Sequence, residues 1–377
     1  MREFRKGEKM EESLKLLSRK IVNYSLKLKE GEKVLITTMI EAKPLVLSLI
    51  EEMKDKNIVP MVRFTDPEVT AALTNMTDDK RIELLKKLGM EDVEHYDAFI
   101  SIRYTTNDYE NKEVSTSIVK KIGEALKKSS NIRTNERKWV LLNYPSKLDA
   151  YKASMKSSTY FKYAMNVMNV DYKDLEERIK PLKELMEKTD KIRITGPNTD
   201  ITFSIKNMPI IPCLGTCNLP DGEIYTAPIR KSINGVITYN TSSPYQGEVF
   251  KNVCLKFKDG KIIEATCEGD NQKLNEIFDT DEGARYIGEF SLGLNPEILN
   301  PMGDILFDEK IIGSLHFTPG ASYDDASNGN KSSVHWDLVL IQRKEYGGGE
   351  IYFDDVLVRK DGLFVLKELL QLNYNLK

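Results

Sequence analysis

The first half of the chain alternates short apolar runs with longer amphipathic segments, and few folds accommodate that order. Four runs have the length and the β-branched content of strands: KVLITT (33–38), IVPMVRF (58–64), DAFISIRY (97–104) and KWVLLNY (138–144). Three segments between them carry apolar residues at three- and four-residue steps, as helices do: 44–56, 67–89 and 115–128. Strand, helix and strand in succession predict parallel pairing through right-handed crossovers, and therefore a layered α/β domain.

After about residue 190 the pattern changes to short strands separated by tight turns. Three hairpins are predicted, with turns at Gly196-Pro197-Asn198, Asp259-Gly260 and Asp361-Gly362. Alternation of apolar and polar residues along these strands predicts antiparallel sheet with one buried face. We therefore predict two domains: an α/β N-terminal domain with a mostly parallel sheet over residues 1–190, and a strand-rich α+β domain with antiparallel sheet over residues 191–377.

Charge, hydropathy and cysteine content narrow the choice of partners and compartment. The 55 Lys and Arg residues nearly balance the 58 Asp and Glu residues, so no basic excess favours nucleic acid. The longest uninterrupted apolar run, PLVLSLI (44–50), is far too short to cross a membrane, and the charged N-terminal segment lacks the apolar region of a secretory signal. We expect a cytoplasmic protein whose four cysteines are reduced.

Histidine is scarce, with three residues in the chain, at positions 95, 316 and 335. His335 and Asp337 lie two residues apart in SVHWDLVLIQ, a predicted strand, so both side chains point to the same face. An imidazole beside a carboxylate on a rigid element forms part of a hydrolytic metal site. The alternative is a core histidine that is hydrogen-bonded to a neighbouring aspartate. We expect His95 to be a surface residue outside any site.

Three further residues occupy comparable positions at or near strand edges. His316 lies at the end of the predicted strand KIIGSLHFTPG, Glu223 follows a Pro-Asp-Gly turn, and Glu289 stands in an otherwise apolar strand. A buried glutamate is costly unless it is paired or coordinated, although each of these carboxylates alone fits an exposed strand position as well. Together with His335 and Asp337 they form a nitrogen and oxygen donor set that suits zinc, cobalt or manganese, with carboxylates able to bridge a pair of ions.

Four runs of the sequence resemble the M29 family of metallo-aminopeptidases, the aminopeptidase T or thermophilic-metalloprotease type: NLPDGEIYTAP, IGEFSLGLNP, LHFTPGASYDDASNGNKSSVHWDLV and RKWVLLNYPSKLDAYKASMKSSTYF. The resemblance covers most of the chain and is most specific from about residue 215 to residue 340. It implies an α/β domain followed by a strand-rich catalytic domain, two divalent metal ions in a cleft, and a homodimer. It also implies removal of N-terminal amino acids from peptide substrates.

The resemblance also assigns site residues. The metal ligands that it implies are Glu223, Glu289, His316, His335 and Asp337, and the loop tyrosine is Tyr323. The chain departs from the family pattern in two places. Family members commonly place an acidic ligand five residues before the first histidine, where this chain has Ile311, and Glu309 is the nearest carboxylate. The glycine pair that usually follows the tyrosine is reduced to Asn328-Gly329.

The expected chemistry is amide hydrolysis by a water molecule that a dinuclear metal site activates. Glu289 is the candidate to bridge the ions or to accept a proton from that water, and sequence does not separate these roles. Tyr323 is the candidate donor to the oxyanion, with a packed loop aromatic as the alternative. Two other functions stay open: a dinuclear amidase, dipeptidase or deacylase of small amides, and a non-catalytic metal-binding protein.

Overall fold

The computed structural model describes residues 2–107, 109–110, 112–245, 247–374 and 376, with backbone alone for residues 2–9. Contacts between Cα atoms divide the chain into two compact units. The first unit comprises residues 1–169 and 215–220, and the second comprises residues 170–214 and 221–377. Each unit is described by itself below.

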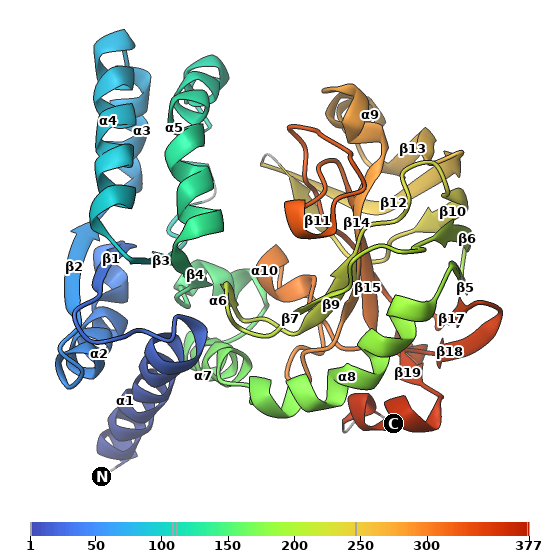
Figure 1. Ribbon diagram of the computed structural model, residues 1–377, viewed down its shortest axis with the longest axis horizontal. Coiled ribbons are helices and arrows are strands. Elements are labelled where there is room, and N and C mark those ends of the chain that lie inside the picture. Colours follow the sequence, from blue (N-terminus) through green and yellow to red (C-terminus); the bar gives the residue numbers. More distant parts are fainter. Residues whose placement is uncertain (1, 108, 111, 246, 375, 377) are drawn as a thin grey trace. The chain divides into compact units, whose positions relative to one another are not determined.

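A parallel sheet forms the centre of the first unit, with the strand order β2-β1-β3-β4-β8. All four pairings in it are parallel. The strands are β1 (Lys33–Thr38), β2 (Val59–Phe64), β3 (Ala98–Arg103), β4 (Lys138–Asn143) and β8 (Asn218–Leu219). The helices are α1 (Arg2–Lys20), η1 (Ile21–Ser25), η2 (Ile40–Ala42), α2 (Lys43–Lys54), α3 (Pro67–Asn75), α4 (Asp79–His95), α5 (Thr116–Glu136), α6 (Lys147–Lys152) and α7 (Ser157–Met168). Helices α4 and α5 pack side by side (Figure 1).

Side-chain capping explains where helices α3 and α4 begin. The predicted segment 67–89 forms two helices rather than one, because Asp78 accepts a hydrogen bond from the backbone N–H of Arg81 and starts α4 anew. Asp66 caps α3 in the same way through the N–H of Val69. The four predicted strands of the first half are confirmed. Apolar residues of β1 and β3 such as Ile36 and Ile100 are buried, whereas the edge strand β2 is largely exposed.

Antiparallel sheets make up the second unit. One sheet runs in the order β16-β15-β14-β9-β7, and the other in the order β11-β12-β10-β6-β5-β17-β18-β19, with β13 paired to β12. The strands of the first of these sheets are β7 (Ile211–Cys213), β9 (Glu223–Thr226), β14 (Ile287–Gly293), β15 (Ser314–Pro319) and β16 (Leu338–Ile341). The strands of the second are β5 (Lys191–Gly196), β6 (Thr199–Ser204), β10 (Asn234–Thr238), β11 (Ser243–Tyr245), β12 (Glu248–Lys258), β13 (Lys261–Glu268), β17 (Glu350–Phe353), β18 (Val356–Lys360) and β19 (Leu363–Phe364).

The helices of the second unit are short apart from the first: α8 (Tyr172–Lys188), α9 (Asn271–Phe278), η3 (Glu282–Arg285), α10 (Ile305–Asp308), η4 (Asp324–Ala326), η5 (Lys344–Tyr346) and η6 (Lys367–Asn373). The three predicted hairpins form as β5–β6, β12–β13 and β18–β19. A parallel sheet with helices followed by antiparallel sheets is the predicted fold class, which is thereby confirmed.

The two sheets of the second unit pack against each other through aromatic rings. Phe203 on β6 contacts Phe290 on β14 and Phe317 on β15, with ring centroids 4.9 and 5.2 Å apart and both pairs edge-on. Phe290 and Phe317 are fully buried. Edge-to-face aromatic packing of this kind stabilises a core beyond the apolar area that it buries. The apolar face of the smaller sheet is therefore firmly held.

Helix α8 groups with the second unit, so the compact units part at residues 169 and 170. The Tyr172 hydroxyl at the start of α8 accepts a hydrogen bond of 2.9 Å from the backbone N–H of Asp221. The helix also packs against β7 and η6. The predicted domain boundary near residue 190 falls after this helix, and the division into functional domains stays a prediction. Within the described residues, no helix is long and apolar enough to span a membrane.

Replacing Phe317 with Ala removes a ring from the centre of this packing. We expect Phe317→Ala to lower the free energy of unfolding by about 3–5 kcal/mol, because the cavity adds to the lost burial. Urea unfolding followed by tryptophan fluorescence measures the change. Phe64→Ala is the matched control, since the Phe64 side chain is 48% exposed. A loss for Phe317→Ala no larger than that of the control contradicts the packing described.

Candidate metal centre

Strand β14 is the middle strand of the smaller sheet and carries polar side chains on one face only. Glu289, Ser291 and Gly293 alternate with Phe290 and Leu292, so the carboxylate and hydroxyl face one way and the apolar groups the other. Because Phe290 is packed in the aromatic core, the neighbouring Glu289 side chain must point to the opposite face of the sheet.

Neighbouring strands add their polar residues to the same face through their register. Ser291 pairs with His316 on β15, and Gly293 pairs with Glu223 on β9. Gly293 also allows the backbone before β15 to pack closely, because a Cβ atom there would lie 2.3 Å from the carbonyl oxygen of Ile311. The Ser291 hydroxyl donates a 2.8 Å hydrogen bond to Glu223 Oε2. Three adjacent strands thus place two carboxylates and an imidazole together.

The five metal ligands expected from the sequence lie close together in two overlapping groups. Glu223, Glu289 and His316 form one group, and Glu289, His335 and Asp337 form the other. In each group the nitrogen and oxygen atoms available for a metal lie within 4.8 Å of one another. Glu289 belongs to both groups.

Both histidines are oriented by backbone carbonyl groups. His316 Nδ1 lies 3.2 Å from the carbonyl oxygen of Glu309, and His335 Nδ1 lies 3.0 Å from that of Ala321. With the Nδ1 proton donated to these oxygens, Nε2 of each ring faces the carboxylates, and in a metal complex Nε2 would lose its proton and supply its lone pair to the ion. His316 Nε2 faces Glu289 Oε1 at 3.3 Å and Glu223 Oε2 at 3.6 Å. This orientation is the one in which histidine binds a metal ion.

In the second group, Glu289, His335 and Asp337, a histidine Nε2 again faces carboxylate oxygens. His335 Nε2 lies 3.7 Å from Glu289 Oε2 and 3.8 Å from Asp337 Oδ1. The Thr318 hydroxyl donates a hydrogen bond to Asp337 Oδ1 and orients that carboxylate. The two oxygens of Glu289 therefore point to different histidines.

The pKa shifts in this centre follow from burial and from mutual charge. Burial raises the pKa of Glu289, although His316 acts in the opposite direction. Burial would lower the pKa of His316, but the hydrogen bond with Glu289 and the charges of Glu223 and Asp337 raise it to about 10. Burial also works against ionisation of Asp337, yet His335 and His316 hold the pKa of this carboxyl below its usual value. Carboxylates that are packed this closely are stabilised by cationic partners.

Glu309 and Lys310, just before β15, lie at the margin of the centre. Sequence reasoning leaves the role of Glu309 open and misses Lys310, since lysine is almost always exposed. The Lys310 ammonium is fully buried, contacts the Glu309 carboxylate and lies 3.5 Å from Glu223 Oε1. Burial acts to lower the pKa of Lys310, but Glu309, Glu223 and Asp221 raise it well above its usual value.

A third group of donor atoms, also not foreseen from the sequence, adjoins Glu223. It consists of Cys213, Asp221 and Glu223, again within 4.8 Å of one another. Burial, followed by the charges of Asp221 and Glu223, raises the pKa of the Cys213 thiol well above its usual value. The thiolate that binds metal is thus disfavoured here. All four cysteines are free.

Tyr323 lies on the loop after β15, where its ring contacts the ring of His335 with centroids 4.8 Å apart. The side chain is 48% exposed, so its hydroxyl can meet a bound molecule. Tyr225 contacts the other side of this ring at 5.6 Å and donates a hydrogen bond to Asp325. His95, as expected, is exposed and ends α4 in the other unit.

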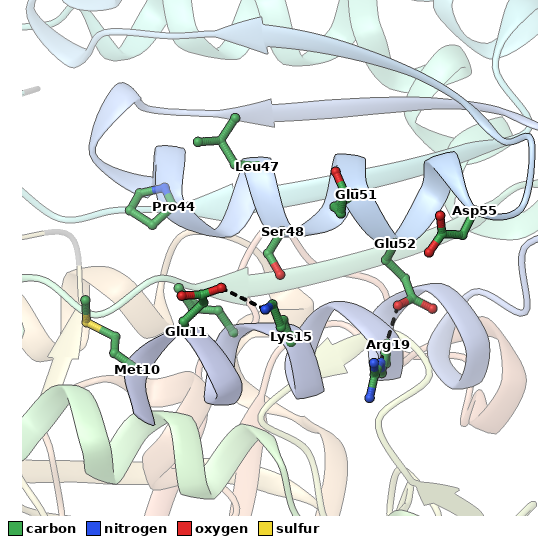
Figure 2. A pocket seen from close by; sticks show the side chains of 11 residues that line it. Met10, Glu11, Lys15, Arg19, Pro44, Leu47, Ser48, Glu51, Glu52 and Asp55 are labelled. Carbon is green, nitrogen blue, oxygen red and sulfur yellow. Dashed lines mark hydrogen bonds and ion pairs between the residues drawn. The ribbon is translucent and has the colours of Figure 1, made fainter. Parts of the chain in front are cut away.

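A separate cavity of about 650 Å³ lies between α1 and α2 in the first unit (Figure 2). Four of the charged side chains that line it pair with one another, Glu11 with Lys15 and Arg19 with Glu52. The metal-ligand groups described above lie in the second unit. The cavity therefore contributes no donor atoms to the candidate centre.

Comparison with known proteins decides the family. Residues 10–362 match the family model described as thermophilic metalloprotease (M29). The chain belongs to this family. The match extends over nearly the whole chain, so it includes both compact units and every residue of the candidate centre.

Relatives of this M29 chain are aminopeptidases. Aminopeptidase T of Thermus aquaticus is 27% identical over 189 residues, which are 44% of this chain and 45% of that protein. Aminopeptidase AmpS of Bacillus subtilis is 29% identical over 126 residues, 32% of this chain and 30% of that protein. The matched segments thus span less than half of the length of these relatives.

A solved structure shares the fold of this M29 chain. Wild-type AmpT from Thermus thermophilus superimposes with a TM-score of 0.77 over 94% of this chain and 99% of that chain, at 18% sequence identity. At this identity the likeness concerns the fold alone, which agrees with the order of sheets described above.

Two local expectations for the histidine segments are wrong. His335 does not lie within a strand, because β16 begins at Leu338 and His335 forms only an isolated bridge with Gly320. His335 and Asp337 still point the same way, while Trp336 stacks on Tyr245 and Phe278. His316 is not at the end of its strand but at the third position of β15.

Asp281 holds the segment that leads to His335. Its carboxylate accepts hydrogen bonds from the Ser332 hydroxyl at 2.7 Å and from the Ser333 N–H and hydroxyl at 2.8 and 2.9 Å. Burial acts to raise the pKa of Asp281, but the N–H of Ser333 and the two hydroxyls lower it below its usual value. The ionised carboxylate therefore stabilises the native protein.

We expect Asp281→Asn to lower the free energy of unfolding at pH 7 by about 1–2 kcal/mol, because charge-assisted hydrogen bonds are lost. The stabilisation is present above the ordinary aspartate pKa of about 3.9 and is lost as the pH falls through the lowered native pKa, so the two proteins converge as the pH falls. Urea unfolding at a series of pH values from 7 downward measures both effects. The control is Asp355→Asn, at an exposed aspartate of the same unit. A difference that does not change with pH contradicts the assignment.

Proposed function

We propose that this protein is a metal-dependent aminopeptidase that hydrolyses N-terminal amino acids from peptides. The observation that carries the proposal is the pair of histidines whose Nδ1 atoms face backbone carbonyls and whose Nε2 atoms face a shared carboxylate. The described donor set of two imidazoles and three carboxylates suits a divalent cation in charge and in ligand type. Membership in a family of metalloproteases supports peptide substrates.

The proposed ligands are Glu223, Glu289, His316, His335 and Asp337, and the proposed cofactor is a pair of divalent ions, zinc, cobalt or manganese. Glu289 supports the pair, because its two oxygens face different histidines. Bound divalent ions would lower the pKa of a coordinated water from about 15.7 toward 7. The site would thereby supply hydroxide at neutral pH.

The chain's own residues would complete the reaction. Glu289 is the buried carboxylate that both donor groups share, and it would either bridge the ions or accept the proton of the activated water through an oxygen that no ion occupies. The ring of Tyr323 contacts that of His335, and the residue is 48% exposed, so its hydroxyl is a candidate donor to the oxyanion of the substrate. Asp324 and Asp325 follow this tyrosine in the chain, and a free substrate amine would meet acidic groups there.

A panel of substrates tests the reaction itself. Amino-acid p-nitroanilides and their N-acetylated analogues are incubated with the protein after loading with zinc, cobalt or manganese and after treatment with a chelator. We expect cleavage of the free-amine substrates alone, loss of activity with the chelator, and recovery when metal is added back. Cleavage of only the acetylated analogues would instead assign a deacylase or amidase, and no cleavage of either would contradict a hydrolytic role.

Glu289→Gln tests the proposed proton acceptor. We expect the rate of hydrolysis to fall by about 10²–10⁴-fold, because the amide neither takes up the proton nor supplies a negative charge. Glu282→Gln is the matched control, since Glu282 is 80% exposed in its ion pair with Arg230 and lies outside the donor groups. Activity of Glu289→Gln within the range of this control contradicts the proposed role.

The homodimer and the cytoplasmic location that the sequence predicts remain proposals. Four free cysteines are compatible with a reducing compartment. Sedimentation of the purified protein tests the dimer directly, since the masses of monomer and dimer differ twofold.

A further inference from the structure

Lys310 is an unusual side chain for the position that it occupies. Its side chain has no exposed surface, and its ammonium contacts Glu309 and lies 3.5 Å from Glu223 Oε1. Lysine is rarely buried unless it is paired, and here both partners are carboxylates. A fixed positive charge therefore lies beside a group of residues whose proposed task is to bind cations.

The backbone around Lys310 leaves little room for it to move away. The N–H of Lys310 donates to the carbonyl oxygen of Phe307, and its own carbonyl accepts from the N–H of Asn295. Gly293 packs so closely that a Cβ atom there would lie 2.9 Å from the Lys310 carbonyl carbon. The backbone of Lys310 is thus fixed by two hydrogen bonds and by the close packing of Gly293.

The contacts of Glu223 divide between its two oxygens. Oε2 accepts from the Ser291 hydroxyl and faces His316 Nε2, whereas Oε1 faces the ammonium. A cation bound by Glu223, Glu289 and His316 would therefore share Glu223 with Lys310. Two positive charges beside one carboxylate repel each other across a poorly solvated space.

The other donor group has different surroundings. The described ion pairs of Asp337 and His335 involve neither lysine nor arginine. The described contacts of the Lys310 ammonium are instead with Glu309 and Glu223. The positive charge of Lys310 therefore repels a cation beside Glu223 more strongly than a cation beside Asp337.

We propose that Lys310 is a positioning residue that makes the two metal positions unequal. The Glu289–His335–Asp337 position binds its ion tightly, and the Glu223–Glu289–His316 position binds its ion weakly. The inference rests on the proposed metal centre, and it adds that the protein holds one resident ion at low free metal while the second ion exchanges.

Titration of the metal-free protein with Zn²⁺ alone, by calorimetry and by competition with a chelating dye, measures the two dissociation constants. In the unmodified protein we expect two binding events, and Glu223→Gln should abolish the weaker one while the tighter one stays. Lys310→Met should tighten the weaker event by about tenfold or more and so bring the two constants closer together. Lys310→Arg keeps the charge and should keep the two constants apart.

Two further variants guard against a purely structural effect. Lys344→Met, an exposed lysine of the same unit, should leave both constants unchanged. The double variant Glu309→Gln with Lys310→Met removes both charges of the pair, and it should fold even where Lys310→Met alone leaves Glu309 unpaired. This variant should also bring the two constants closer together.

The outcomes separate this inference from the proposed function. Two binding events whose ratio is the same in the unmodified protein, in Lys310→Met and in the double variant would overturn the role of Lys310 and leave the metal centre standing. The absence of tight Zn²⁺ binding in the unmodified protein would overturn the metal centre and this inference together.

Discussion

Two hydrogen bonds to backbone carbonyls determine what this centre can hold. The carbonyl oxygens of Glu309 and Ala321 lie beside the Nδ1 atoms of His316 and His335, so both rings present Nε2 to the same carboxylate. The carbonyls belong to segments on either side of β15, and neither ring can turn without giving up its partner. A site that relied on side-chain partners alone would allow the other ring nitrogen to face the carboxylates.

The orientation of Glu289 depends on the core behind it. Along β14 the apolar residues face Phe203 and the polar residues face away, because side chains alternate across a strand. The packing of apolar side chains on one face of β14 thus fixes the position of the Glu289 carboxylate on the other face. Burial also explains the electrostatics: carboxylates that water does not solvate raise the pKa of His316 and require a cation nearby. Lys310 supplies one such cation, and divalent ions would supply the others.

Sequence reasoning succeeds where periodicity is strong and fails where the decisive contact is long-range. The parallel strands and the three hairpins are visible in the sequence. The five donor residues are a prediction from the scarcity of histidine and from the family resemblance, and the structure brings them close together. The helical pattern over residues 67–89 predicts one helix, although Asp78 is an N-cap residue that starts a second helix. The burial of Lys310 has no local signal, since it depends on Glu223, which lies far away in the sequence. The late start of β16, at Leu338, has no local signal either, because the preceding loop is held by long-range hydrogen bonds from the N–H and hydroxyl of Ser333 to Asp281.

The most direct measurement is a crystal structure of the zinc-loaded protein, with anomalous scattering recorded at the zinc edge. The account predicts anomalous peaks about 2.0–2.2 Å from the Nε2 atoms of His316 and His335, with an oxygen of Glu289 in the same coordination sphere. Zinc bound elsewhere in the chain, or bound through Nδ1 with the imidazole rings turned over, would contradict it.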